Sequence, residues 1–145
     1  MRILRFAALV ILAVTALIGG VRADDSSAHP IKRLEVIVTT ADEFGASTYD
    51  TVLFSLGPSY EWALEAPAKR PFKNSATDHF VLPSQGLAAR DIKWIRLHKA
   101  RGDDWLLQGL EIWIDGKPWY RNGEINIWFD DNRDEWTAPN LPTSK

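Results

Sequence analysis

The sequence predicts an all-β protein, an antiparallel β-sandwich of two roughly four-stranded sheets. Two observations lead to this fold class: apolar and polar residues alternate along short runs, and turn-forming residues close many of these runs. The composition agrees, because 145 residues with 46% hydrophobic content can form one domain with its own core. Helical turns are expected only at residues 85–91 and 104–108.

Eight short strands are expected in order along the chain. The first is residues 34–39, where Leu34, Val36 and Val38 take every second position. Asp115-Gly116 joins two later runs, and its preference for positive φ predicts a hairpin turn there. Such short, turn-separated strands are typical of an antiparallel sandwich. The other expected strands are residues 52–56, 60–64, 79–82, 92–98, 110–114, 117–121 and 125–129.

Residues 1–23 are expected to be a signal peptide. Arg2 and Arg5 precede the apolar run 6–18, and small residues up to Ala23 suit a cleavage site. The run has 13 residues, whereas a membrane-spanning helix needs about 20, and the sequence has no cysteine for a lipid anchor. We therefore expect a secreted or periplasmic protein that is not an integral membrane protein after cleavage. An uncleaved anchor helix is the alternative.

The rest of the chain divides into three parts by composition. Residues 24–31 are polar and are expected to be a flexible lead-in. Residues 32–136 contain all the predicted strands and are expected to form the sandwich. Residues 137–145 hold two prolines and are expected to be a loose tail.

Charge and cysteine content exclude several classes of protein. The chain has 17 basic and 19 acidic residues, and removal of residues 1–23 takes away three arginines and leaves a net charge of −5. An acidic protein repels phosphate backbones, so nucleic acid is not an expected partner. The absence of cysteine from the sequence excludes disulfides, thiolate metal sites and a cysteine nucleophile.

The sequence lacks the common catalytic motifs, so no enzyme is predicted. It contains no G-x-S-x-G turn, no H-E-x-x-H helix and no glycine-rich phosphate loop. His79 and His98 are isolated in predicted strands. A hydrolase with two catalytic carboxylates stays open, since 19 acidic residues allow many pairs.

Three segments, in order, together resemble one known family. They are residues 34–48 running into 52–54 (LEVIVTTADEFGAST, then VLF), 77–82 followed by 92–97 (TDHFVL, then IKWIRL), and 103–107 running into 110–112 (DDWLL, then LEI). Across residues 33–129 the chain is similar to the PLAT (lipoxygenase-homology) domain family. The resemblance implies a non-catalytic β-sandwich that attaches enzymes to lipid surfaces or protein partners. Some members of the family bind calcium in the loops at one end.

Four carboxylates are the candidate ligands for such a calcium ion. Asp42 and Asp50 flank the loop 45–48, and Asp103 and Asp104 lie in the loop that the resemblance places beside it. Calcium takes six to eight oxygen ligands, chiefly carboxylates and carbonyls. The alternative is that these are solvated turn residues whose carboxylates accept hydrogen bonds from backbone N–H groups.

Both candidate calcium motifs are incomplete. In the first loop Tyr49 stands where the family usually has Asp, and Ser47 stands where it has a second Gly. Residues 130–134 match the first three ligands of an EF-hand loop, but Glu135 replaces the required Gly and Leu141 replaces the bidentate Glu. We interpret residues 130–134 as a charged turn.

Aromatic residues are the candidates for a binding surface. Trp113 and Trp128 alternate with the aliphatic residues of their strands, so both are predicted to point outward on neighbouring strands. Together with Trp119 they would form a surface for a lipid, a sugar or a protein. Phe44, at the tip of the first loop, is the candidate for a membrane-inserting side chain. The alternative is that these aromatic side chains are covered by a loop or by a second copy of the chain.

The leading functional hypothesis is a secreted, non-catalytic binding module. It would contact a lipid surface or a protein partner through loops and exposed aromatics, with calcium as a candidate aid, because a bound cation would reverse the field of an acidic protein. One alternative is a carbohydrate-binding module that stacks sugars on Trp113, Trp119 and Trp128. Another is an interaction subunit of a larger secreted protein.

Overall fold

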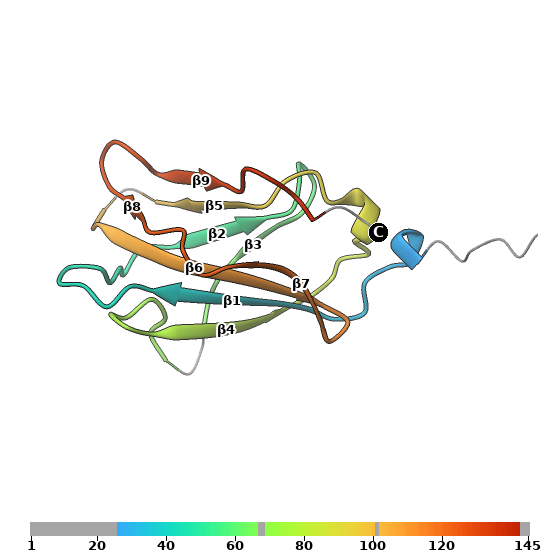
Figure 1. Cartoon of the computed structure of the whole chain (residues 1–145), viewed down its shortest axis with the longest axis horizontal. Helices are drawn as coiled ribbons and strands as arrows, with labels where there is room; N and C mark the ends of the chain where they lie inside the picture. Colours follow the sequence, from blue (N-terminus) through green and yellow to red (C-terminus); the bar gives the residue numbers. More distant parts are fainter. Residues whose placement is uncertain (1–25, 67–68, 101, 143–145) are drawn as a thin grey trace, which may run out of the picture.

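Two antiparallel sheets face each other in the computed structural model, which describes residues 26–66, 69–100 and 102–142 (Figure 1). The predicted all-β sandwich is confirmed. The predicted signal peptide, residues 1–23, lies outside the described residues. One sheet has the order β4 (Thr77–Leu82), β1 (Leu34–Thr40), β6 (Trp105–Ile114) and β7 (Lys117–Asn122), with β8 (Ile127–Phe129) also paired to β6. The other sheet has the order β3 (Glu61–Ala63), β2 (Val52–Ser55), β5 (Arg96–Lys99) and β9 (Glu135–Thr137).

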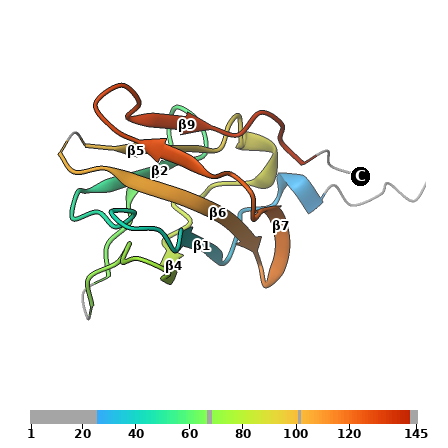
Figure 2. The same ribbon diagram turned by 60° about the vertical axis from the view of Figure 1, so that its left-hand side comes forward.

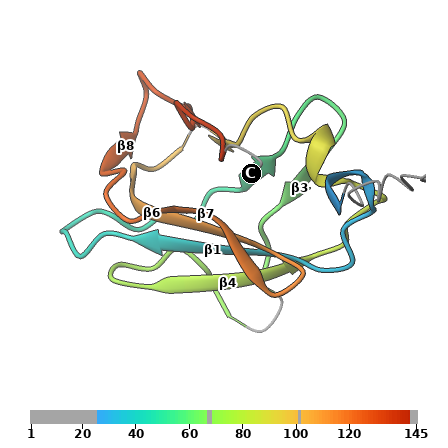
Figure 3. The same cartoon turned by 45° about the vertical axis from the view of Figure 1, so that its right-hand side comes forward.

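Strand β1 shows how the alternating pattern produces a sheet with one buried face. Leu34, Val36 and Val38 are fully buried, while the residues between them are half-buried on the outer face. The strand pairs with β4 on one side and β6 on the other, so its backbone groups are satisfied within the sheet. Figure 3 shows β1, β4 and β6 together in one layer and β3 in the other.

Aromatic side chains fill the space between the two sheets. Trp105 is fully buried, and its ring centroid lies 5.2 Å from that of Phe72 and 5.0 Å from that of Phe129. The indole N–H of Trp105 donates to Thr40 Oγ1 at 3.0 Å, so the buried polar atoms of both side chains are paired. Trp105 therefore belongs to the core.

The β6–β7 hairpin has the predicted turn (Figure 2). Asp115 and Gly116 have φ angles of 50° and 78°, the left-handed conformation that this residue pair tolerates best. The Asp115 carboxylate also accepts hydrogen bonds from the backbone N–H groups of Lys32 and Arg33, both 2.8 Å long. The turn thus fixes the approach of the chain to β1.

Two local predictions are wrong. The helical turn expected at residues 104–108 is instead the start of β6, because the backbone there pairs with β1 and β8 together. The strand expected at residues 92–98 begins only at Arg96, because Ile92 closes the short 3₁₀ turn η2 (Ala89–Asp91). Helical structure in the described residues is limited to η2 and η1 (Ser26–Ala28), and no helix among them is long and apolar enough to cross a bilayer.

Both ends of the sandwich extend beyond the expected limits of residues 32 and 136. In the expected lead-in, Pro30 forms a bridge with Ala88, and Ile31 is buried in the core. In the expected tail, Ala138 is buried and its N–H donates to Ile95 C=O at 2.9 Å. Strand β9 was not predicted, since its three residues hold a single buried side chain and follow a charged turn.

Candidate functional site

One end of the sandwich carries the loop 41–51 between β1 and β2, whose tip exposes Phe44. This loop projects beyond the sheets at the left of Figure 1. The Phe44 side chain is 100% exposed, the largest exposure of any large apolar residue among those described. Gly45 has φ +79°, and the hydrogen bond from Ala46 N–H to Glu43 C=O, 3.0 Å, closes the turn. A fully exposed Phe at a projecting turn has no structural role within the domain.

The base of this loop is fixed to β6. Ala41 N–H donates to Leu106 C=O, and Leu106 N–H donates to Ala46 C=O, both at 3.1 Å. The side chains of Ala41, Ala46 and Leu106 form a small buried cluster against which the half-buried Trp128 packs. We call these four residues the loop-base cluster. Trp128 on β8 therefore lies at the same end of the molecule as the loop that bears Phe44, as Figure 1 shows for the two elements.

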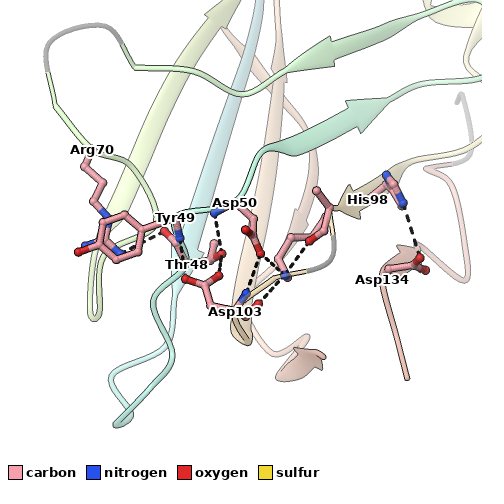
Figure 4. A network of polar contacts seen from close by, with 9 residues as sticks. Thr48, Tyr49, Asp50, Arg70, His98, Asp103 and Asp134 are labelled. Atoms are coloured by element: carbon pink, nitrogen blue, oxygen red, sulfur yellow. Dashed lines mark hydrogen bonds and ion pairs between the residues drawn. The ribbon is translucent and has the colours of Figure 1, made fainter. Parts of the chain in front are cut away.

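A network of polar contacts joins loop 41–51 to the β5–β6 loop (Figure 4). Lys99 Nζ donates to Asp50 Oδ2 at 2.6 Å, and Asp103 N–H donates to the same oxygen at 3.0 Å. The Asp103 carboxylate accepts the Thr48 hydroxyl and the Tyr49 N–H, the latter at 2.9 Å. We call these five residues the lysine network. It holds together two loops that are about 50 residues apart in the sequence.

Lys99 is not among the residues predicted to form the site, although the strand pattern contains the signal. Lys99 is 2% exposed and ends β5, two residues after the buried Leu97. Because side chains two apart share one face of a strand, the alternation that buries Ile95 and Leu97 also points Lys99 inward. An inward lysine at a strand end indicates an acidic partner nearby, because a buried charge must be paired.

The electrostatics of the network favour an ionised Asp50. Burial is the largest single influence on Asp50 and acts to raise its pKa. The hydrogen bond and charge of Lys99, with hydrogen bonds from Asp103, outweigh burial and hold the pKa of Asp50 below its ordinary value. An aspartate with a lowered pKa stabilises the folded state above its unfolded pKa, and this stabilisation is lost as the pH falls.

We therefore expect an acid-dependent loss of stability that Asp50→Asn removes. At pH 7 the variant should melt below the wild type, because it lacks the charge that pairs with Lys99. The difference in melting temperature should shrink as the pH falls below about 4, near the unfolded pKa of Asp. Thermal melts of both proteins from pH 7 to pH 3 measure it. A difference that stays constant down to pH 3 would contradict this assignment.

The four predicted calcium ligands do not come together as a calcium site. Asp50 and Asp103 are parts of the lysine network, while Asp42 and Asp104 are exposed and lie outside it. Among the described residues, no group of three or more His, Asp or Glu side chains is arranged to hold a metal ion. The donor set does not fit calcium, because an ammonium group, a hydroxyl and backbone N–H groups already bind three of the four carboxylate oxygens of Asp50 and Asp103.

Residues 130–134 form a charged turn at the same end. The Asp130 carboxylate accepts the N–H groups of Asn132, 2.8 Å, and Arg133, 3.0 Å. Asp134 lies 3.8 Å from His98 Nε2, as Figure 4 shows. These carboxylates bind groups of the domain itself, in agreement with the interpretation of the segment as a turn.

The predicted tryptophan surface is not continuous, because Trp128 lies beside the start of β6 and Trp113 lies near its end. Trp128 pairs with Leu106 near the start of β6, whereas Trp113 pairs with Pro118 near its end. Seven strand residues separate these positions, roughly 23 Å. Trp113 is half-buried and donates to Glu111 Oε2 at 3.1 Å. Trp119 packs against the main core.

A cavity of about 320 Å³ lies beside the lysine network, and no pattern in the sequence indicates it. Tyr49, Arg70 and Phe72 are among its lining residues. The Arg70 guanidinium lies over the Tyr49 ring, 3.0 Å from its centroid, and donates to Thr48 C=O at 3.2 Å. The contact joins residues that are 21 positions apart, which no local pattern could indicate.

Comparison with known proteins identifies relatives for most of the chain, although no protein-family model matches it. A phospholipase C from Clostridium novyi is 33% identical over 116 residues, 72% of this chain and 28% of that protein. Solved structures with a similar fold include the alpha-toxin of Clostridium absonum, with a TM-score of 0.65 and 21% identity. The match covers 76% of this chain and 32% of the toxin. The alpha-toxin of Clostridium perfringens has a TM-score of 0.63 and 23% identity over 80% of this chain and 33% of the toxin.

Lipoxygenases share the fold as well. The coral 8R-lipoxygenase, described as activated by calcium through a C2-like domain, has a TM-score of 0.56 and 18% identity over 72% of this chain and 16% of the enzyme. The chain thus spans a third or less of each of these four proteins. The resemblance to PLAT domains is confirmed in the fold.

Proposed function

We propose that this chain, which has the fold of a PLAT domain, is an exported, non-catalytic module that attaches to a lipid surface through the loop tip bearing Phe44. The observation that carries the proposal is the complete exposure of Phe44 on a projecting loop. Burial of such a side chain in an apolar medium is favourable by about 1.5–3 kcal/mol. Trp128, which packs on the buried residues of the loop-base cluster, is half-buried beside this loop and adds partly exposed apolar surface.

The charges around the tip determine which lipid surface it suits. Asp42 and Glu43 precede Phe44 directly, and both are exposed. An acidic tip is repelled by anionic lipid, so attachment would rely on insertion of the apolar side chain. We therefore propose a zwitterionic surface as the preferred one.

The relatives support a role at lipid surfaces. The phospholipase C and the lipoxygenases are named for action on lipids, and this chain matches only a third or less of each. PLAT domains, which the sequence resembles, attach enzymes to such surfaces. The predicted signal peptide supports export. No observation favours the carbohydrate alternative, since Trp113 and Trp128 form no joint platform.

Vesicle flotation tests the proposal. The purified protein should float with phosphatidylcholine vesicles, and replacement of part of the lipid by phosphatidylserine should weaken the binding, because the tip is acidic. Increasing salt should have little effect on binding to the neutral vesicles. A protein that stays at the bottom of the gradient with every lipid mixture would discard the membrane function.

A further inference from the structure

We infer that Lys99 is a built-in cation that takes the place of a metal ion and holds the loop end together without calcium. Its ammonium group donates to three oxygen atoms: Asp50 Oδ2 at 2.6 Å, Ala100 C=O at 2.8 Å and the backbone C=O of Asp103. An ammonium group has three N–H donors, so all of them are used. One carboxylate and two carbonyl oxygens around a cation are also the ligand types that calcium takes.

The position of Lys99 is built into the fold. The residue is 2% exposed and ends the buried face of β5, so its charge is enclosed and must be paired. The β5–β6 loop fits closely around this pair at Gly102. A Cβ atom added at Gly102 would lie 2.3 Å from Asp50 Oδ1 and 2.6 Å from Oδ2. A side chain at position 102 would therefore displace the Asp50 carboxylate from its place against Lys99.

Calcium and Lys99 compete for the same oxygens. A calcium ion lies 2.3–2.6 Å from its ligands, which is the distance at which the ammonium already contacts Asp50. Two cations cannot occupy that position together. The remaining carboxylate, that of Asp103, is bound to the Thr48 hydroxyl and the Tyr49 N–H. Calcium binding here would require the lysine network to break.

The lysine network also fixes the second half of loop 41–51, since Thr48, Tyr49 and Asp50 all belong to it. The loop that carries Phe44 is then held at its start by the β6 backbone and at its end by Lys99. Under the proposed function, on which this one consequence rests, attachment to vesicles should be the same with calcium and with a chelator.

Calorimetry and thermal melting test the inference without any lipid. Calcium chloride added to chelator-treated protein should give no saturable heat, and the melting temperature should be equal in calcium and in EGTA. A site whose Kd is a hundred times below the calcium concentration would raise the melting temperature by roughly 10 °C. A rise of that kind in the wild type, abolished by Asp50→Asn, would overturn the inference.

Lys99→Met provides the second arm. The variant should melt well below the wild type in EGTA, because Asp50 loses its counter-charge, and calcium should partly restore its melting temperature. Lys117→Met, at an exposed lysine on β7, is the matched control and should behave as the wild type. A Lys99→Met protein that melts at the same temperature as the wild type would contradict the role of Lys99.

Failure of vesicle binding in both calcium and EGTA would refute the proposed function alone, since the lipid-free measurements decide the role of Lys99.

Discussion

Phe44→Asp is expected to abolish vesicle binding, and Phe44→Ala is expected to weaken it by roughly 10- to 100-fold. The side chain is completely exposed and contacts no other part of the domain, so its apolar surface becomes buried only when the tip enters a lipid layer. Aspartate at the same place adds a third acidic side chain beside Asp42 and Glu43. The free energy of unfolding should change by no more than about 0.5 kcal/mol, because the residue is at the surface.

Titration of the protein with phosphatidylcholine vesicles, followed by tryptophan fluorescence, gives the apparent Kd of each variant. Val81→Asp is the matched control, because Val81 is also an exposed apolar residue, 59% exposed. It lies on the outer face of the sheet, at the end of β4 that is distant from the loop bearing Phe44. This control should bind vesicles like the wild type. Equal binding by Phe44→Asp and the wild type would show that the tip is not the attachment point.

The strands that the sequence predicts well are those whose pattern is strictly local. β1 alternates without interruption, and the Asp115-Gly116 turn requires only the conformational tolerance of two adjacent residues. In both cases the buried face and the turn follow from chain geometry alone. The sandwich could therefore be predicted from residues that are near each other in the sequence.

The failures have a common physical cause, which is pairing with distant segments. Trp105, Leu106 and Leu107 are all buried, a run with no alternation. Trp105 and Leu107 pack in the core between the sheets, whereas Leu106 packs with Ala41, Ala46 and Trp128. Strand β9 exists because its residues 135–137 pair with β5, nearly 40 positions earlier. Local pattern does not contain such pairings.

The candidate site also has a part that local sequence indicates and a part that only contacts between distant segments determine. The sequence predicted that four acidic residues lie in two neighbouring loops, and two of them, Asp50 and Asp103, are joined in the structure. It did not indicate which cation they hold, because that depends on the side chain of Lys99 from the end of another strand. Residue type predicts that carboxylates need a positive partner, but only the fold determines whether the partner is an ion or a lysine.

Trp105→Ala is expected to reduce the free energy of unfolding by about 3–5 kcal/mol. The change removes the ring that packs on Phe72 and Phe129 and leaves a cavity that the two sheets cannot close. It also leaves the fully buried Thr40 hydroxyl without its partner. Since single domains unfold with about 5–15 kcal/mol in total, the variant should approach the limit of folding.

Urea unfolding followed by circular dichroism measures the loss, with Trp113→Ala as the control for removal of an indole from the outer face. If Trp105→Ala proves too unstable to purify, Trp105→Phe and Thr40→Val, alone and combined, separate the two contributions in a double-mutant cycle. Phe keeps most of the ring volume but removes the N–H donor to Thr40 Oγ1, so the two changes together should cost less than the sum of the single changes. Additive costs would mean that the hydrogen bond contributes nothing. A smaller loss from Trp105→Ala than from Trp113→Ala would mean that Trp105 is not the centre of the core.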